Sequence, residues 1–389
     1  MDFTIPDELT QLRDSFASFL EREVRPVEES VHEDLWLPGP GTERVADAGR
    51  QIVRKSAEAG FYAAHMPDDV GGSDLSALGT TLLIEDAARS GLRLGSFAIS
   101  PPNPSGPTPL LLDLPKHLWS TYVRPVVDAE KTMCFALTEP EAGSDAQSIR
   151  THAGGEGDGW VINGHKHYIT NGDRADFAVV IAQADAGITA FLVPSDQYTV
   201  GKKQYTLADS HPSELLLDNA RIPADHVLGE VGQGFGTAMK FLNSGRAYIG
   251  ARCLGLAEYC LEEATRHARS RSAFGRSLGK FQGVSFPLAE SKAEVEAMRW
   301  LTYHLAWLVD QGEHPIMDSS IVKFYDTERA YAIADRCLQV FGGMGLLKEG
   351  PIEHVLRDLR MMRIVEGASE VQQLVISRML GLGEATTRL

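Results

Sequence analysis

The chain has 389 residues, of which 43% are hydrophobic and 23% charged, so it is long enough for two or three domains and a large core. Its 53 acidic and 37 basic residues give a formal net charge of -16, which argues against a nucleic-acid-binding or anionic-membrane surface. The four cysteines form no CxxC pair, so we expect neither a disulfide framework nor a zinc site, and a reducing, cytoplasmic location.

The first third of the chain has the pattern of amphipathic helices. Apolar residues recur at three- and four-residue steps at Leu9, Leu12, Phe16 and Phe19, and helical patterns return over 42–60, 76–90 and 116–130. The N-terminus is acidic and has no basic region before an apolar run, so no signal peptide is expected. The longest uncharged run, Leu94–Leu112, is rich in proline, and no membrane helix is expected there.

The pattern changes after Thr132 to short strand-like runs. Two Asn-Gly turn signals, at Asn163 and Asn171, are flanked by such runs. Further runs cover Phe177–Ala182, Ile188–Val193 and Leu215–Ile222. No long helical pattern interrupts them, which predicts a small antiparallel β-barrel.

From Gly232 onward the apolar period is again helical and long. The candidate helices are Phe235–Arg271, Phe286–Gln311, Pro315–Phe341 and Ile352–Leu380. Short connections between them favour a four-helix bundle. The expected architecture is therefore mainly α with a central β domain: a helical domain over 1–131, the β-barrel over 132–230 and the bundle over 231–389.

One acidic residue near the C-terminus is a candidate catalytic base. Glu366 is followed by Gly367, and Ser369 with Gln372 three residues on has the form of a capping box, so a last helix is expected to begin there. Glu366 would then occupy a short break between two helices. A general base near neutral pH needs burial, whereas a helix N-terminus favours the anion. From this stretch alone, a solvated surface glutamate and a buried base both remain open.

Other features point away from common cofactor and metal sites. The glycine-rich segments at 154–159, 229–236 and 341–345 lack the G-x-G-x-x-G spacing after a strand, and there is no Walker A motif. A Rossmann-type or P-loop nucleotide site is therefore disfavoured. The histidines have no metal-ligand spacing, so we expect no metal site.

Five motifs together resemble the acyl-CoA dehydrogenase family, in its order and at its spacing. They are Leu137-Thr-Glu-Pro-x-Ala-Gly-Ser-Asp145, Asn163-Gly-x-Lys-x-Tyr-Ile-Thr-Asn-Gly172, Arg271-Ser-Ala-Phe-Gly275 with Gln282, Gln339-Val-Phe-Gly-Gly343 and Glu366-Gly367. The similarity runs from about Ile5 to the last helix. It implies the same succession of helices, β-barrel and helix bundle.

The resemblance implies FAD bound without a Rossmann fold. It assigns flavin contacts and phosphate contacts to Phe135, Leu137, Thr138, Gly143, Ser144, Tyr168, Ile169, Thr170, Ala368 and Glu370. It assigns contacts from a neighbouring subunit, to the pyrophosphate and adenosine, to Arg271, Phe274, Gln282, Gln339, Gly342 and Gly343. A guanidinium suits phosphate because it can fork onto two oxygens. Sites shared in this way imply an oligomer, and the family's usual state is a homotetramer built as a dimer of dimers.

The resemblance also implies a reaction. Glu366 matches the base that removes the α-proton of an acyl-CoA while the β-hydrogen leaves as hydride to flavin N5, giving the trans-2-enoyl-CoA. The thioester carbonyl would be polarised by the N–H of Glu366 and a flavin hydroxyl. Substrate contacts fall to Ser144, Asn243, Arg246 and Gly367. Some relatives carry the base just before this arginine, but Gly245 cannot act as one.

The resemblance implies an electron-transferring flavoprotein as the electron acceptor. Two departures from the family pattern keep three alternative functions open. Ala368 replaces the family's usual threonine, and Glu370 stands where a neutral residue is common. The same fold could serve an acyl-CoA oxidase or a flavin monooxygenase, or a non-catalytic subunit of a hetero-oligomeric dehydrogenase. The sequence does not choose among straight, branched, aromatic and steroid-type acyl groups.

Overall fold

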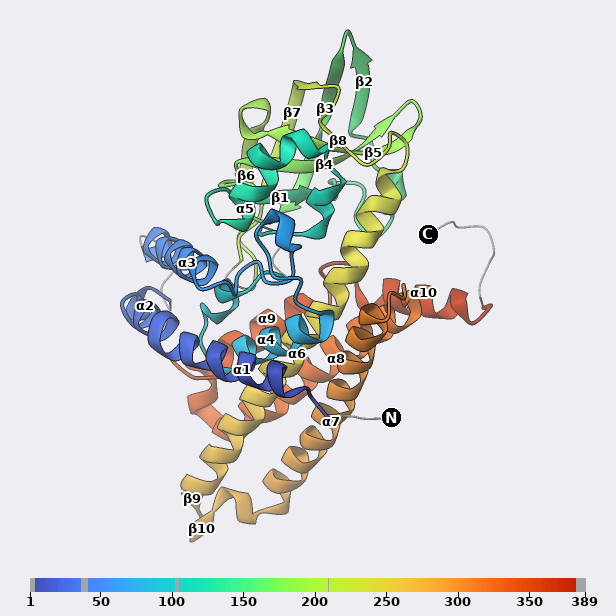
Figure 1. The fold of residues 1–389 in the computed structure, drawn as a ribbon. Helices are drawn as coiled ribbons and strands as arrows, with labels where there is room; N and C mark the ends of the chain where they lie inside the picture. The colour runs from blue at the N-terminus through green and yellow to red at the C-terminus, as the bar shows by residue number, and fades with distance from the viewer. Residues whose placement is uncertain (1–3, 36–40, 102–104, 209, 383–389) are drawn as a thin grey trace. The chain divides into compact units, whose positions relative to one another are not determined.

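A computed structural model describes residues 4–35, 41–101, 105–208 and 210–382. The chain divides into two compact units (Figure 1). One, the helical unit, consists of Met1–Tyr62, Leu75–Ile99 and Arg246–Leu389. The other, the sheet unit, consists of Ala63–Asp74 and Ser100–Gly245. None of the helices within the described ranges is both long and apolar enough to cross a membrane.

The N-terminal part of the helical unit contains the predicted amphipathic helices. They are α1 (Asp7–Phe19), α2 (Arg25–Glu29), α3 (Gly41–Glu58) and α4 (Ala77–Arg89). The predicted stripe of α1 is confirmed at its end, where Phe16 and Phe19 are buried in a core with residues of α3 and α4. Ser76 caps α4, because its side chain accepts the N–H of Gly79 at 3.0 Å.

The remainder of the helical unit is a bundle of long helices. They are α6 (Gly234–Ser270, in this unit from Arg246 on), α7 (Gln282–Asp310), α8 (Ile316–Phe341), α9 (Glu353–Met362) and α10 (Ser369–Met379). The first three confirm the predicted segments closely. The fourth segment is split into α9 and α10 by the expected break around Glu366. A short hairpin, β9 (Ser272–Ala273) with β10 (Arg276–Ser277), joins α6 to α7.

The sheet unit is built on one eight-stranded sheet. Its strands are β1 (Met133–Ala136), β2 (His152–Glu156), β3 (Gly159–Ile169), β4 (Phe177–Ala184), β5 (Gly187–Pro194), β6 (Thr199–Lys203), β7 (Ser213–Pro223) and β8 (Val227–Leu228). The order is β6-β7-β3-β2-β4-β5-β8, and β1 pairs with β4. Alternate residues of β4 fill two separate cores: Val179 and Ile181 one, Ala178 and Val180 the other.

The sheet differs from the predicted antiparallel barrel in two respects. β1 and β4 are parallel, and β2 meets β4 in a parallel bridge, so the sheet is mixed. Among the described strands β6 and β8 do not pair, so closure of a barrel is not confirmed. β8 is two residues long and already pairs with β5, which leaves little backbone for a further partner.

The helix predicted over 116–130 is shorter and less regular. Residues 116–127 form a 3₁₀ turn, a π-helical turn and then α5 (Arg124–Val127). Pro125 has no N–H to donate to the preceding turn, and the carbonyl of Thr121 is instead bound by Lys131 Nζ at 3.0 Å. Proline therefore interrupts a pattern that its apolar neighbours would otherwise support.

Candidate active site

Glu366 and Gly367 occupy the break between α9 and α10 in left-handed backbone conformations, with φ of +54° and +92°. The φ of Gly367 favours glycine, and a Cβ atom there would also lie 2.5 Å from Gln372 Nε2, so the Gln372 side chain would have to move. The backbone N–H of Glu366 makes no hydrogen bond to another residue within the described parts of the chain. It is therefore a donor that an incoming carbonyl oxygen can use.

The predicted capping box at the start of α10 is wrong. The N-cap position is Ala368, whose side chain cannot accept a hydrogen bond, and the helix begins at Ser369. The Ser369 hydroxyl donates to Glu328 Oε1 of α8 at 2.6 Å, and Gln372 Nε2 donates to the carbonyl of Gly367 at 3.0 Å. Ser369 thus binds the break to α8, and Gln372 binds α10 to the backbone of the break; neither side chain caps the helix.

The carboxyl group of Glu366 is withdrawn from water although the residue as a whole is only partly buried. Its Oε2 atom is buried and has no hydrogen-bond partner among the described residues. Burial raises the pKa of Glu366 to about 7, against the opposing influence of the charges on Arg246 and Lys323. Glu366 is therefore not a solvated surface carboxylate, and its pKa suits proton transfer near neutral pH.

Arg246, on α6, lies against the same break. Its side chain is buried, its Nε donates to the carbonyl of Glu366 at 3.5 Å, and its Nη2 is 3.4 Å from where a Gly367 Cβ would be. Burial lowers the pKa of Arg246, although a guanidinium remains charged at any working pH. The structure therefore brings together three residues of the candidate site, Glu366, Gly367 and Arg246.

Two further buried ionisable groups on α8 were not predicted. Lys323 is fully buried, its Nζ has no hydrogen-bond partner within the described chain, and burial lowers its pKa to about 8. Asp326, one turn on, accepts the Thr302 hydroxyl at 2.6 Å, and burial raises its pKa well above the usual value. The sequence did contain a signal for their burial, because Lys323 and Asp326 lie at helical spacing from the apolar residues Val322 and Ala330, which are buried.

In the sheet unit, the two predicted flavin-contacting segments lie side by side. The N–H of His167 donates to the carbonyl of Thr138 at 2.8 Å, which joins the end of β3 to the turn after β1. Tyr168 has a φ of +56°, its side chain is 59% exposed, and its N–H donates to Gln204 Oε1 at 3.2 Å. An aromatic face is thus presented to solvent beside Thr138.

The other predicted residues of the sheet unit differ in how far they are exposed to solvent. The ring of Phe135 packs at 4.7 Å from that of Phe241, and Leu137 and Ile169 are buried. Thr170 and Asn243 are half-buried. Gly143 and Ser144 lie on an exposed turn, and a Cβ at Gly143 would meet no atom within 4 Å. The space over that turn suits a close approach of a ligand to the backbone.

The predicted intersubunit residues gather at one end of the bundle. This set is Arg271, Phe274, Gln282, Gln339, Gly342 and Gly343. His267 of α6 stacks on Phe341 of α8 at 4.4 Å, which holds the ends of these helices together. Within the helical unit this end lies away from α10 (Figure 1). Phe274, at the hairpin tip with φ of +51°, is 95% exposed.

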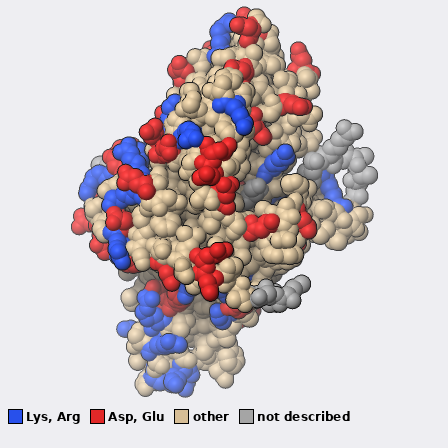
Figure 2. Space-filling model, viewed as in Figure 1, with Lys and Arg blue, Asp and Glu red and all other residues tan. Residues whose placement is uncertain are grey.

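Basic side chains gather over this end of the bundle, as Figure 2 shows. The exposed ones in this stretch are Arg266, Arg269, Arg271, Arg276 and Lys280. Guanidinium groups can bind the oxygens of a nucleotide pyrophosphate, and an exposed aromatic ring beside them can stack on the base.

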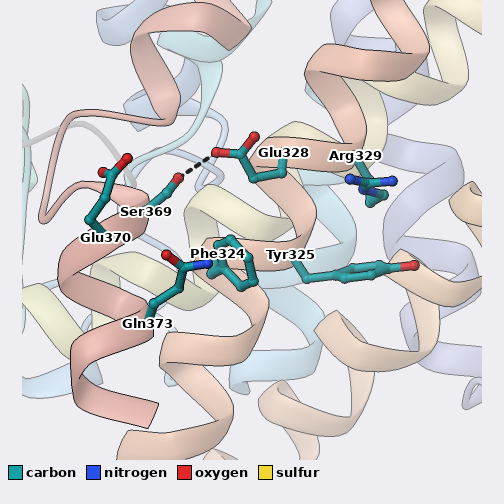
Figure 3. A pocket seen from close by; sticks show the side chains of 7 residues that line it. All are labelled: Phe324, Tyr325, Glu328, Arg329, Ser369, Glu370 and Gln373. Atoms are coloured by element: carbon teal, nitrogen blue, oxygen red, sulfur yellow. Dashed lines mark hydrogen bonds between the residues drawn. The ribbon is translucent and has the colours of Figure 1, made fainter. Parts of the chain in front are cut away.

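A groove of about 580 Å³ lies between α8 and the start of α10 (Figure 3). It is lined by Phe324, Tyr325, Glu328, Arg329, Ser369, Glu370 and Gln373. Arg363 forms an ion pair with Glu328 at 2.7 Å, so the carboxylate behind Ser369 is neutralised. Glu370 is exposed and lines this groove, whereas Ala368 does not.

Comparisons with known proteins show which family this chain resembles. The chain matches the N-terminal, middle and C-terminal domains of acyl-CoA dehydrogenases over residues 6–113, 134–219 and 232–381. It is 35% identical to a 3-(aryl)acrylate reductase from Clostridium sporogenes, over 97% of this chain and 99% of the relative. It is 36% identical to subunit CarC of a caffeyl-CoA reductase-Etf complex from Acetobacterium woodii, over 85% and 89%.

A solved structure gives the same result for the fold. The chain resembles a glutaryl-CoA dehydrogenase from Mycobacterium smegmatis in complex with FADH2, with a TM-score of 0.85, 27% identity and coverage of 99% of this chain and 97% of that one. The chain belongs to the acyl-CoA dehydrogenase family, whose members are FAD-dependent oxidoreductases.

Proposed function

We propose that this protein catalyses α,β-dehydrogenation of an acyl-CoA thioester to the trans-2-enoyl-CoA, with Glu366 as the base. The observation that carries the proposal is the buried, unpartnered carboxyl oxygen of Glu366, in a group with a pKa of about 7. FAD, when bound, supplies the acceptor for the hydride that leaves the β-carbon.

Residues of the chain itself remove the α-proton, polarise the thioester carbonyl and position the base. The Glu366 carboxylate takes the α-proton, and its own N–H, which has no acceptor among the described residues, donates to the thioester carbonyl. Such a donor is needed because the α-proton of a thioester is weakly acidic. Arg246 holds the backbone of the base through the Glu366 carbonyl, and Gly245 offers no competing base.

The cofactor would be held by the predicted segments. The turn from Phe135 to Thr138 and the end of β3 around Tyr168 serve the flavin ring, and the turn at Ser144 serves the phosphates and the substrate's thioester arm. The basic end of the bundle serves the pyrophosphate and adenosine of a neighbouring subunit's FAD. The separation of this end from α10 within one helical unit supports a site completed by a second copy. A homotetramer built as a dimer of dimers is the proposed assembly.

The domain limits proposed are 1–131, 132–230 and 231–389. The described cysteines are free and buried, which supports a reducing, cytoplasmic location.

The direction of the reaction depends on the electron partner. The two relatives described above are reductases, and one belongs to an Etf complex. A base with a pKa of about 7 can return a proton to the α-carbon as readily as remove one. Reduction of a 2-enoyl or aryl-acryloyl substrate by the same residues is thus the second candidate, with an electron-transferring flavoprotein as partner in either direction.

Anaerobic mixing tests the proposal and its direction. The oxidised protein is mixed with straight, branched and aryl-substituted acyl-CoAs, and bleaching of the flavin absorbance and the enoyl product are followed. The reduced protein is mixed with the matching enoyl-CoAs and free aryl acrylates, and return of the absorbance is followed. We expect at least one acyl/enoyl pair to react. Bound flavin that no substrate bleaches or reoxidises would contradict the proposal.

A further inference from the structure

A buried ion pair lies beneath the turn that follows β1. Lys166, on β3, is fully buried, and its Nζ donates to Glu139 Oε1 at 2.7 Å and to the carbonyl of Leu137 at 2.8 Å. Burial lowers the pKa of Lys166 to about 8, against the opposing influence of Glu139. Taking both charges out of water is costly, so such a pair persists only where its remaining hydrogen bonds are satisfied.

Glu139 satisfies that condition. Its two carboxylate oxygens accept the backbone N–H groups of Arg150 at 2.6 Å and Thr151 at 2.9 Å, in addition to Lys166. Burial alone would raise the pKa of Glu139, but these hydrogen bonds hold it below the usual value. The carboxylate thereby joins the turn after β1 to the chain that enters β2.

The pair also fixes the register between the two segments proposed to contact the flavin. Lys166 binds the carbonyl of Leu137, and the next residue, His167, donates its N–H to the carbonyl of Thr138. Tyr168 follows directly. The carbonyl of Leu137 belongs to the same peptide group as the N–H of Thr138, so a cation on that oxygen makes the N–H a stronger donor.

We propose that Lys166 and Glu139 form a positioning pair that holds the Leu137–Thr138 peptide and the Tyr168 ring in the arrangement that binds the FAD ring. The inference rests on the proposed function only for the assignment of these segments to FAD. Neither residue touches the cofactor; each acts through the backbone that it holds.

The test compares FAD binding by deflavinated full-length variants. Lys166→Met should raise the FAD dissociation constant, measured by quenching of flavin fluorescence, about tenfold or more, because a charge-assisted hydrogen bond is lost. The visible absorption band of the FAD that still binds should lose its fine structure, and Lys166→Arg should recover part of the affinity. Circular dichroism of the flavin-free variants checks that they are folded.

The matched control removes an ion pair of similar length from the surface of the same sheet. Arg221, on β7, contacts Glu156, on β2, at 2.6 Å, and both are exposed. Arg221→Met should leave the dissociation constant and the spectrum unchanged.

The inference is overturned if Lys166→Met binds FAD within about twofold of the wild type with an unaltered spectrum. If Lys166→Met does not fold, Glu139→Gln decides in its place, because it removes the charge and keeps the size. Unchanged FAD binding by these variants, in a wild type that dehydrogenates acyl-CoA, would remove the positioning pair and leave the proposed function intact. A wild type that binds FAD but reacts with no substrate would remove the proposed function and leave the positioning pair intact.

Discussion

At the scale of single residues, the charge on Lys323 opposes protonation of Glu366. The groups that face Lys323 are Cys253, Glu366, Arg246 and Glu328. The rate of flavin bleaching should rise with pH through the pKa of the base. Lys323→Met should shift that rise upward by roughly one pH unit, because a buried positive charge near the carboxylate is lost.

The measurement is the bleaching rate with a saturating acyl-CoA from pH 5.5 to 9. Asp326→Asn is the matched control on α8, because asparagine keeps the size of this buried side chain and can still accept the Thr302 hydroxyl, and Asp326 is not among the groups that shift the pKa of Glu366. A profile for Lys323→Met that coincides with the wild type would contradict the electrostatic role of Lys323.

The same residues show what sequence could predict at this scale. The break at Glu366 and its glycine follow from local pattern, and the structure confirms both. Lys323 sits within an apolar helical pattern, and its burial depends on how α6 approaches α8. A Cβ at Gly250 of α6 would lie 2.3 Å from Val322, an approach that no local pattern specifies.

At the scale of elements, a charged network joins α4 to α7. Glu85, on α4, is 1% exposed, accepts the hydroxyl of Tyr303 at 2.6 Å and has Arg299 at 3.7 Å. Burial raises the pKa of Glu85 to about 7. Between its ordinary pKa and pH 7, the folded protein therefore keeps a proton that the unfolded chain has lost. This group makes the free energy of unfolding fall as pH rises through that window.

Glu85→Gln should flatten this dependence by up to about 1.4 kcal/mol per pH unit, the contribution of one proton. Chemical unfolding at pH 5, 6 and 7 measures it in both proteins, with the exposed Glu156→Gln as control. Parallel curves for Glu85→Gln and the wild type would show that Glu85 is ionised in the folded state.

The prediction of helices and strands was accurate where the spacing of apolar residues determines the element. It failed where one contact between distant residues determines it. The long helices α6, α7 and α8 follow their periodic patterns to within a few residues at most ends. The capping of α10 differs from the prediction because Ser369 bonds to Glu328, and the sheet is mixed rather than antiparallel because β1 pairs with β4, a contact between distant segments. Such partners lie 41 and 44 residues apart in the chain.

At the scale of the whole molecule, the proposed assembly predicts complementation between two inactive variants. One carries Arg271→Ala with Phe274→Ala and keeps its base. The other carries Glu366→Gln and keeps its hairpin. In a mixed oligomer, the first variant's site receives an intact hairpin from the second, so co-expression should restore dehydrogenation that neither variant has alone.

Activity is measured after tandem purification with two different tags, which isolates the mixed oligomers. If the hairpin served its own subunit, every site would lack either the base or the hairpin. Mixed oligomers without activity would therefore contradict the shared site.

Anaerobic bleaching of bound flavin in Glu366→Gln tests the central claim most directly. Glutamine preserves the size and the left-handed backbone position but cannot accept the α-proton. The account predicts FAD bound as in the wild type and a bleaching rate lower by about 10²- to 10⁴-fold, the usual contribution of a general base. Bleaching at the wild-type rate in a fully flavinated Glu366→Gln protein would show that another group removes the proton.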